Sequence, residues 1–170
     1  MAEDGLYGEV VIRVANRPGD IGGAVALHGR LYTAEYGMDQ SMEAYSAYGI
    51  GGFLLERLER GPEVGELWVA EQGGRIVGAI SMQAEEGRGR LRWLVLDAAL
   101  RGRGVGRALV EVALDYARER GFPGVFLTTL KGLDAAHGIY RKAGFELTES
   151  SPAQKWGLSS EEQRFELSFD

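Results

Sequence analysis

Cysteine is absent from this sequence, and histidine is almost absent. A chain without cysteine forms no disulfide bond, no thiolate metal site and no cysteine nucleophile, and its composition fits a reducing compartment. The two histidines, His28 and His137, lie far apart, and neither belongs to a His-Glu-x-x-His or histidine–carboxylate pattern with metal-ligand spacing. We therefore expect no metal cofactor.

Long apolar runs and an excess of positive charge are also missing. No stretch approaches the roughly 18 apolar residues of a membrane helix, and the acidic start from Met1 to Gly5 lacks the apolar segment of a signal peptide. The net charge of −6 and the pI of 5.1 are the reverse of what nucleic acids and anionic membranes attract, and such an overall field favours cationic substrates. The expected setting is cytoplasmic, with no nucleic-acid or membrane partner.

What the sequence does contain is the composition of a globular protein. With 45% hydrophobic residues in a chain of 170, a core can form without disulfide bonds. The sequence has no linkers, repeats or low-complexity runs. We expect residues 1–170 to form one domain. Hydrophobic periodicity predicts the order βααβββαβαββ, which is typical of a mixed α/β (α+β) domain. The expected strands cover residues 9–14, 66–71, 75–82, 90–96, 125–129, 145–148 and 164–169, and the expected helices cover residues 21–36, a segment after Asp39, 104–120 and 134–142.

Turn and cap signals add detail to these elements. Asp20 and Asp39 are expected to cap the first two helices, and Gly37 is expected to end the first. The second helix is expected to be interrupted by Gly49, Gly51 and Gly52. Residues 72–74 predict a hairpin turn, and residues 150–163 predict a loop. The nearly continuous apolar run at residues 90–96 indicates a central strand buried on both faces.

The most informative segment follows that strand, where residues 101–107 read Arg-Gly-Arg-Gly-Val-Gly-Arg before a predicted helix. A helix N-terminus offers unpaired N–H groups and a partial positive charge, so phosphates bind there. Glycines let the backbone approach an anion closely. Arginines at a helix start oppose the helix dipole, and a bound polyphosphate would explain three of them.

Three phosphate-binding motifs compete for this segment. A P-loop needs a lysine after the glycines, and none is present. The dinucleotide fingerprint needs a glycine where Arg107 or Leu109 stands, and an acid about 20 residues further on, where residues 126–128 are Phe, Leu and Thr. The remaining motif is the pyrophosphate turn of coenzyme A enzymes.

Two segments carry a family resemblance. Arg101-x-x-Gly104-x-Gly106 matches the [QR]-x-x-G-x-[GA] signature of the GNAT superfamily of N-acetyltransferases, and residues 135–145 resemble that family's A-x-x-[LI]-Y-x-x-x-G-F segment. The resemblance extends over about residues 9–169. The segment at residues 31–37 is most similar to GNAT domains fused behind MarR-type DNA-binding domains, and we expect no such DNA-binding domain in this chain.

The resemblance implies the GNAT acyl-CoA N-acyltransferase fold. This is a central mixed, mostly antiparallel sheet that splays between strands four and five and is flanked by helices. It implies that acetyl-CoA is the co-substrate. It also implies that Tyr140, near the CoA sulfur, acts as the general acid, and that His137 lies near the cofactor. The other cofactor-binding residues that it implies are Leu94, Val95 and Leu96 for the pantetheine arm and acetyl group, and Arg101, Gly102, Arg103, Gly104, Val105, Gly106 and Arg107 for the pyrophosphate.

Residues for the acceptor amine come from one face of the helix at residues 21–36. His28, Tyr32 and Glu35 are three or four residues apart and share that face. We predict that Glu35 is the base or the amine anchor, with His28 as the alternative. Two positions depart from the family pattern, because Leu130 stands where many relatives carry Asn and Ala98 where relatives often carry Pro.

Three functions remain open at this stage. The first is acetyl transfer from acetyl-CoA to the primary amine of a small molecule by direct attack. The second is acetylation of a protein N-terminus or lysine, and the third is a CoA-binding sensor without turnover. A homodimer is expected by analogy with similar proteins. Trp68, Trp93 and Trp156 are expected to be anchors without chemistry.

Overall fold

A computed structural model describes residues 8–170, so the N-terminal segment from Met1 to Gly5, on which the absence of a signal peptide was predicted, lies outside the described residues. The elements in chain order are β1 (Val11–Val14), α1 (Asp20–Tyr36), α2 (Gln40–Arg60), η1 (Pro62–Val64), β2 (Gly65–Gln72), β3 (Arg75–Glu85), β4 (Arg88–Leu96), η2 (Ala98–Leu100), α3 (Val105–Glu119), β5 (Gly124–Leu130), α4 (Asp134–Lys142), β6 (Glu146–Lys155) and β7 (Leu158–Ser168). This order matches the predicted one, with two short 3₁₀ turns, η1 and η2, added.

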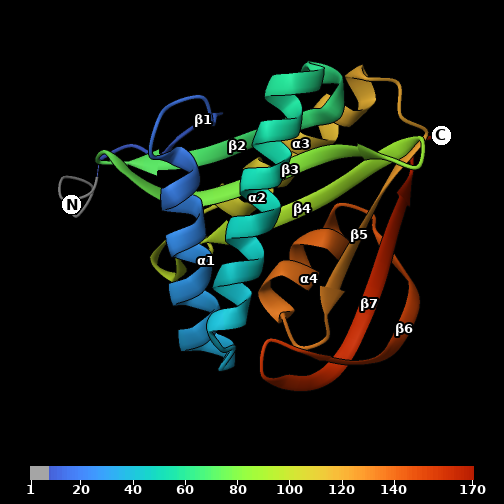
Figure 1. Ribbon diagram of the computed structural model, residues 1–170. Helices are drawn as coiled ribbons and strands as arrows, with labels where there is room; N and C mark the ends of the chain where they lie inside the picture. Colours follow the sequence, from blue (N-terminus) through green and yellow to red (C-terminus); the bar gives the residue numbers. More distant parts are fainter. Residues whose placement is uncertain (1–7) are drawn as a thin grey trace.

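The strands form one mixed sheet in the order β1-β2-β3-β4-β5-β7-β6. Every neighbouring pair is antiparallel except β4 and β5, which pair in parallel only at Gly89 with Val125 and Arg90 with Phe126. Beyond these two pairs β4 and β5 diverge, as Figure 1 shows. The structure therefore confirms both the central position of β4 and the splay between strands four and five.

Helices cover the two faces of the sheet and bury a separate core on each. Leu67 and Val69 of β2 pack with α1 and α2, whereas Trp68 and Ala70 of the same strand pack with α3. This alternation is the two-residue period of a strand. Figure 1 shows α1 and α2 side by side on one face, with α4 beside the diverging end of β5.

Two caps agree with the sequence and one does not. Gly37 ends α1 in the left-handed conformation with φ 69, and the Asp39 side chain accepts a hydrogen bond from the amide of Ser41. Asp20, predicted as a cap, is instead the first residue of α1 behind Gly19. The prediction was wrong because the Asp20 carboxylate accepts two hydrogen bonds of 2.8 Å from Arg13, which join β1 to α1.

The second helix is continuous from Gln40 to Arg60, which corrects the predicted interruption. Gly49 is required by packing, because a Cβ atom there would lie 2.3 Å from Cζ2 of Trp93. Gly51 and Gly52 have no neighbour within 4 Å of such an atom and remain inside the helix. A close contact with β4 therefore outweighs the low helix propensity of this glycine.

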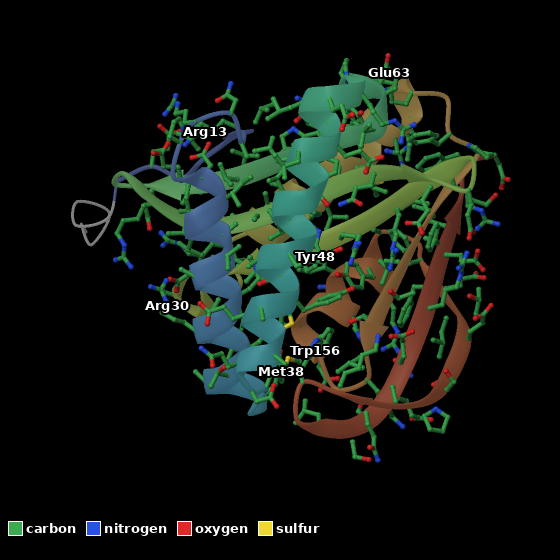
Figure 2. All side chains as sticks on the ribbon, viewed as in Figure 1. Arg13, Arg30, Met38, Tyr48, Glu63 and Trp156 are labelled. Atoms are coloured by element: carbon green, nitrogen blue, oxygen red, sulfur yellow. The ribbon has the colours of Figure 1, made fainter. Side chains whose placement is uncertain are left out.

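The C-terminal hairpin corrects a second prediction. Residues 150–163 form no loop, because β6 and β7 pair along almost their whole length around the Trp156–Gly157 turn. Their alternation was hidden because β6 is an edge strand that is exposed at nearly every position and contains Pro152. The hairpin brings Trp156 to the α1–α2 connection, where its carbonyl accepts a hydrogen bond of 2.9 Å from the amide of Asp39. Figure 2 shows Met38 and Trp156 at this junction.

Candidate active site

A bulge in β4 organises the centre of the candidate site. The register shifts between Ala79 and Ser81 of β3, so that two residues of β4 face one residue of β3. Trp93 has φ 60, a conformation that bulky residues rarely adopt. Because of this bulge Arg92 and Trp93 point to the same side of the strand. The Arg92 guanidinium lies 4.4 Å from the centre of the indole ring.

After the bulge, the backbone of β4 turns polar groups toward the gap beside β5. The amide of Asp97 donates to the carbonyl of Val77 at 2.8 Å, on the β3 side. Alternate residues of a strand direct their N–H and C=O groups to the same side. Leu94 and Leu96 therefore face the gap, whereas Val95 is turned toward β3. Of the three residues predicted to hold the pantetheine arm, two turn their backbone groups toward this gap and one does not.

Tyr32 of α1 crosses to this strand. Its hydroxyl donates a hydrogen bond of 2.8 Å to the carbonyl of Leu94. Burial raises the pKa of Tyr32, so the hydroxyl stays protonated and remains a donor. The bond joins α1 to the part of β4 that has no strand partner on this side. It leaves the second lone pair of the Leu94 carbonyl for another partner.

The glycine turn has the geometry of an anion site. Gly102 and Gly104 have φ 74 and 80, and nothing lies within 4 Å of where a Cβ atom on either would stand. No side chain caps α3, and the first helical amide to bond back is that of Ala108, to the carbonyl of Gly104 at 3.0 Å. The amides of residues 105–107 therefore lack an intrahelical acceptor. These features fit a diphosphate.

Gly106 serves packing. A Cβ atom at this position would lie 2.8 Å from Cδ1 of Ile139, so the glycine allows α3 and α4 to approach closely. Arg101 and Arg107 line the groove beside the turn, and Arg103 belongs to the turn itself. The segment at residues 101–106 thus combines an open backbone at Gly102 and Gly104 with a close helix contact at Gly106, and the last two of these glycines belong to the sequence signature.

Three neighbouring cavities lead from the turn to the far side of the sheet. A groove along α3 shares Leu96, Arg101 and Gly106 with a channel between α1, β4 and α4. That channel shares Tyr32 and Leu94 with a third cavity. We call this third one the acceptor cavity, and its lining residues are His28, Tyr32, Met38, Met42, Tyr45, Arg90, Leu91, Arg92, Trp93, Leu94, Leu127, Thr128, Thr129, Leu130, Leu133, Tyr140, Lys155, Trp156 and Glu162.

Tyr140, the predicted general acid, lies in the acceptor cavity and is 6% exposed. Its ring packs against Phe145 and Phe165. Burial raises its pKa well above the ordinary value, and the nearby Tyr32 raises it further. The hydroxyl is therefore protonated at neutral pH, as a hydrogen donor must be.

His28 also lines the acceptor cavity, 1% exposed. Its Nδ1 lies 2.8 Å from the carbonyl of Ala24. A carbonyl only accepts, so Nδ1 carries the hydrogen and Nε2 carries a lone pair. Nε2 is buried and has no partner among the residues that the structure describes. Burial lowers the pKa of His28 to about 4, so the ring is neutral at pH 7.

Glu35 lies on the other side of Tyr32. It lines the channel, and its carboxylate pairs with Arg101 at 2.7 Å. The face predicted to hold the amine is thus divided, with His28 and Tyr32 in the acceptor cavity and Glu35 beside the glycine turn. Because its charge is already matched by an arginine, Glu35 is poorly placed to take a proton from an amine.

His137 is a buried residue of α4 and belongs to the lining of none of the three cavities. Its ring centre lies 5.2 Å from that of Phe165, and burial, followed by Arg141, lowers its pKa. Leu130, at the position where many relatives carry Asn, is 2% exposed and forms part of the acceptor cavity. Ala98 begins the short η2 turn.

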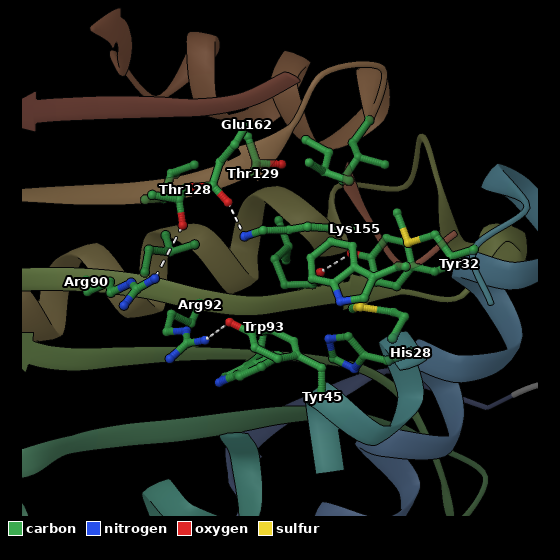
Figure 3. A pocket seen from close by; sticks show the side chains of 18 of the residues that line it. His28, Tyr32, Tyr45, Arg90, Arg92, Trp93, Thr128, Thr129, Lys155 and Glu162 are labelled. Atoms are coloured by element: carbon green, nitrogen blue, oxygen red, sulfur yellow. Dashed lines mark hydrogen bonds and ion pairs between the residues drawn. The ribbon is translucent and has the colours of Figure 1, made fainter. Parts of the chain in front are cut away.

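Sequence reasoning missed the residues that give the acceptor cavity its character. Arg92, Tyr45 and Trp156 come from β4, α2 and the hairpin, and Figure 3 shows Arg92 bonded to the Tyr45 hydroxyl. The ring of Tyr45 lies 5.4 Å from that of Trp93 and 5.5 Å from that of Trp156. The adjacent Arg92 and Trp93 inside an apolar run were the one available signal.

Neither a membrane helix nor a metal cluster is found in the described part of the chain. Within residues 8–170, no helix is both long and apolar enough to span a bilayer. The same residues contain no group of three or more His, Asp or Glu side chains that could hold a metal ion.

Comparison with known proteins relates the chain to one family of enzymes. The profile of the acetyltransferase (GNAT) family matches residues 29–145. N-acetyltransferase family 8 member 2 of Rattus norvegicus is 34% identical over 49% of this chain and 40% of its own length. N-acetyltransferase 8B of Homo sapiens is 34% identical over 52% of this chain and 42% of its own length. The chain thus aligns with about two fifths of these curated relatives.

Solved structures agree in fold. A ribosomal-protein-alanine N-acetyltransferase from Brucella melitensis has a TM-score of 0.74 at 22% identity, covering 94% of this chain and 99% of its own. A putative acetyltransferase from Salmonella typhimurium, solved with its cofactor acetyl-CoA, has a TM-score of 0.74 at 17% identity, covering 95% and 94%. With more than half of its residues matched by the family profile, the chain belongs to the GNAT family of acetyltransferases.

Proposed function

We propose that this protein is an acetyl-CoA-dependent N-acetyltransferase that transfers the acetyl group to the primary amine of a small molecule by direct attack. One observation carries the proposal. The uncapped N-terminus of α3 lies at one end of a series of cavities whose other end holds a hydroxyl donor, Tyr140, and an unpaired acceptor, His28 Nε2.

In this proposal acetyl-CoA binds through its diphosphate to the amides of residues 105–107. Arg101 and Arg107 supply positive charge. The pantetheine arm follows the channel, where the backbones of Leu94 and Leu96 face it. The thioester then reaches the gap between β4 and β5. The family relationship and the fit of the turn to a diphosphate support this path.

The chemistry follows from the two groups in the acceptor cavity. The neutral amine attacks the thioester carbonyl carbon, a C–N bond forms and the C–S bond breaks. Tyr140 donates its hydroxyl hydrogen to the leaving sulfur, whose basicity also rises in a desolvated site. His28 Nε2 accepts the N–H of the amine, takes up the proton that the nitrogen loses and passes it to the Tyr140 oxygen, which has given its own hydrogen to the sulfur. Both side chains thus return to their starting state, and one proton passes from nitrogen to sulfur overall. The low pKa of His28 means that its ring holds the proton only transiently. We assign this role to His28 rather than to Glu35.

A substitution at Tyr140 tests the assignment. Tyr140→Phe removes the donor and keeps the ring, so kcat for CoA release should fall about 100-fold or more, within the range for general acid catalysis. The affinity for CoA, measured by calorimetry, should change less than about threefold, because the diphosphate contacts remain.

Tyr116→Phe is the matched control, because this tyrosine lies on α3 and its hydroxyl contacts Pro62, far from the cavity. It should leave kcat unchanged. A Tyr140→Phe variant with the kcat of the parent protein would remove Tyr140 from the mechanism. Intact CoA binding with no CoA release on any amine would favour a sensor, and turnover on peptides alone would favour protein acetylation.

A further inference from the structure

Three cations line the acceptor cavity, Arg90, Arg92 and Lys155, and one of them has no acid paired with it among the described residues. Arg90 pairs with Glu85 at 3.0 Å, and Lys155 pairs with Glu162. Arg92 has no ion pair with any residue in the described part of the chain, although its guanidinium is partly buried against the Trp93 ring. The excess is local, since the whole protein carries a net charge of −6.

The surroundings of Arg92 make this charge unfavourable without a partner. Burial, followed by the nearby Arg90, lowers the pKa of Arg92 from its ordinary value. The guanidinium has one side-chain hydrogen bond, a 2.7 Å bond to the Tyr45 hydroxyl. A half-buried guanidinium with donors to spare is well suited to a carboxylate, which accepts two parallel hydrogen bonds.

Three aromatic rings of the cavity, those of Tyr45, Trp93 and Trp156, already have a cation of the protein beside them. Arg92 already lies over Trp93 and at 5.9 Å from the centre of the Tyr45 ring, and the Lys155 ammonium lies 5.7 Å from that of Trp156. The protein's own cations therefore already occupy positions on these three rings that would otherwise attract a cationic substrate. A polyamine or a lysine-rich segment would meet like charges here.

The neutral side of the cavity lies next to this charge. The His28 ring stands nearly perpendicular to the Trp93 indole with ring centres 5.9 Å apart, while Arg92 lies over the face of the same indole. Met38 and Met42, both buried, supply an apolar wall. An amine acceptor at His28 Nε2 can thus carry an anionic group toward Arg92 and an apolar group toward the methionines, as Figure 3 helps to follow.

We propose that the acceptor is an amino acid, a primary amine that also carries a carboxylate and an apolar or aromatic side chain, and that Arg92 binds the carboxylate. The inference rests on the proposed acetyltransferase function and deepens it. It reverses the expectation from net charge, which favoured cationic substrates.

Matched acceptors test this choice. CoA release is measured with phenylalanine, 3-amino-3-phenylpropanoate and 6-aminohexanoate, each beside its primary amide, and with phenethylamine and spermidine. For the preferred acid, kcat/KM should exceed that of its amide by about tenfold or more, as expected for a charge-assisted pair. Spermidine should be the poorest acceptor.

Variants of Arg92 then test whether this side chain causes the preference for the acid over its amide. Arg92→Gln should lower kcat/KM for the acid about tenfold and leave the amide within about twofold, while Arg92→Lys should keep part of the preference. Arg88→Gln is the control, because Arg88 lies on the same strand outside the cavity and pairs with Glu166. An equal loss of kcat/KM for acid and amide in Arg92→Gln would show that Arg92 is structural. If the parent protein has no higher kcat/KM for acids than for their amides, or prefers spermidine, the proposal is overturned.

The failure of the proposed function is separable from this outcome. If CoA binds by calorimetry and no amine releases thiol, the acetyltransferase proposal fails. Binding of N-acetylphenylalanine and its amide in the presence of CoA still tests the carboxylate site. The acid should bind about tenfold more tightly, and Arg92→Gln should remove the difference. Equal affinities would overturn the carboxylate site as well.

Discussion

His28 is a histidine whose protonation state is fixed by its place in the helix. Nδ1 donates to the carbonyl of Ala24 one turn earlier, and the buried ring packs against the rings of Tyr32 and Trp93. Charging this ring would bury a cation with no acid beside it. The result is a neutral side chain of one tautomer, which is what an acceptor of an amine hydrogen requires.

This burial predicts a pH dependence of stability. Because the pKa of His28 is about 4 in the folded protein and 6.5 as its ordinary value, the unfolded chain binds more protons between these limits. Stability should therefore fall as the pH drops below 6.5, by at most about 1.4 kcal/mol per unit. Between pH 7 and 4.5 urea denaturation should show a loss about 2 kcal/mol larger for the parent protein than for His28→Phe. Equal losses would contradict a buried neutral histidine.

Glu35 leads to a different expectation, which separates it from His28. Its carboxylate pairs with Arg101 and would compete with the proposed diphosphate for that arginine. Glu35→Gln should therefore leave kcat within about twofold and strengthen CoA binding by up to about fivefold, since partly exposed ion pairs contribute 0 to about 1 kcal/mol. Calorimetry and steady-state kinetics measure both quantities. A loss of kcat by more than about tenfold would restore Glu35 as the base.

At the scale of elements, α2 and β4 depend on each other. The bulge turns Trp93 toward α2, and the helix accommodates the ring by having no side chain at Gly49. The same contact places Tyr45, one turn earlier, against the rings of Trp93 and Trp156. One local distortion of a strand thereby positions a helix and a wall of the acceptor cavity.

A pair of glycine substitutions in α2 checks this dependence. Gly49→Ala places a Cβ atom 2.3 Å from the Trp93 ring, so the free energy of unfolding should fall by about 1 to 3 kcal/mol through overpacking. Gly52→Ala, exposed in the same helix with nothing within 4 Å, should raise it by about 0.5 to 1 kcal/mol through helix propensity. Urea denaturation distinguishes the two, and similar effects at both positions would refute the packing role of Gly49.

At the scale of the whole molecule, the sheet consists of two parts joined by few backbone bonds. The antiparallel strands β1 to β4 and the group β5, β7 and β6 meet at two residue pairs near Gly89 and Arg90. Beyond these pairs Tyr32 of α1 lies beside the gap, bonded to Leu94 of β4 and packed against the cluster that contains Leu130 of β5, and the proposed substrate path lies there. A ligand in this gap would contact both parts at once.

CoA should accordingly stabilise the fold. At a free concentration 100 times its Kd, binding adds about 2.7 kcal/mol to the free energy of unfolding. For a chain of this size 1 kcal/mol shifts Tm by about 2 to 4 °C, so thermal melts should rise by roughly 5 to 11 °C. Higher salt should reduce the shift, because phosphate contacts are screened. The absence of any shift at saturating CoA would contradict the proposed site.

The features that the sequence determined by itself are local. The glycine turn at residues 101–107, the stop at Gly37, the cap at Asp39 and the order of the elements follow from backbone conformation, hydrogen bonding and apolar spacing between near neighbours. These depend on a few adjacent residues, and no distant contact is needed to specify them.

Tertiary structure decided what depends on residues far apart in the chain. Three of these features depend on a partner from another element: the pairing of β6 with β7, the continuity of α2 through Gly49 and the ion pair between Glu35 and Arg101. The charge of Arg92 is unmatched because the fold places it against Trp93 without pairing it with an acid. The gain from packing and pairing can exceed local propensity, and a charge has a partner only where the fold supplies one. The character of the acceptor cavity is therefore a property of the assembled sheet and helices.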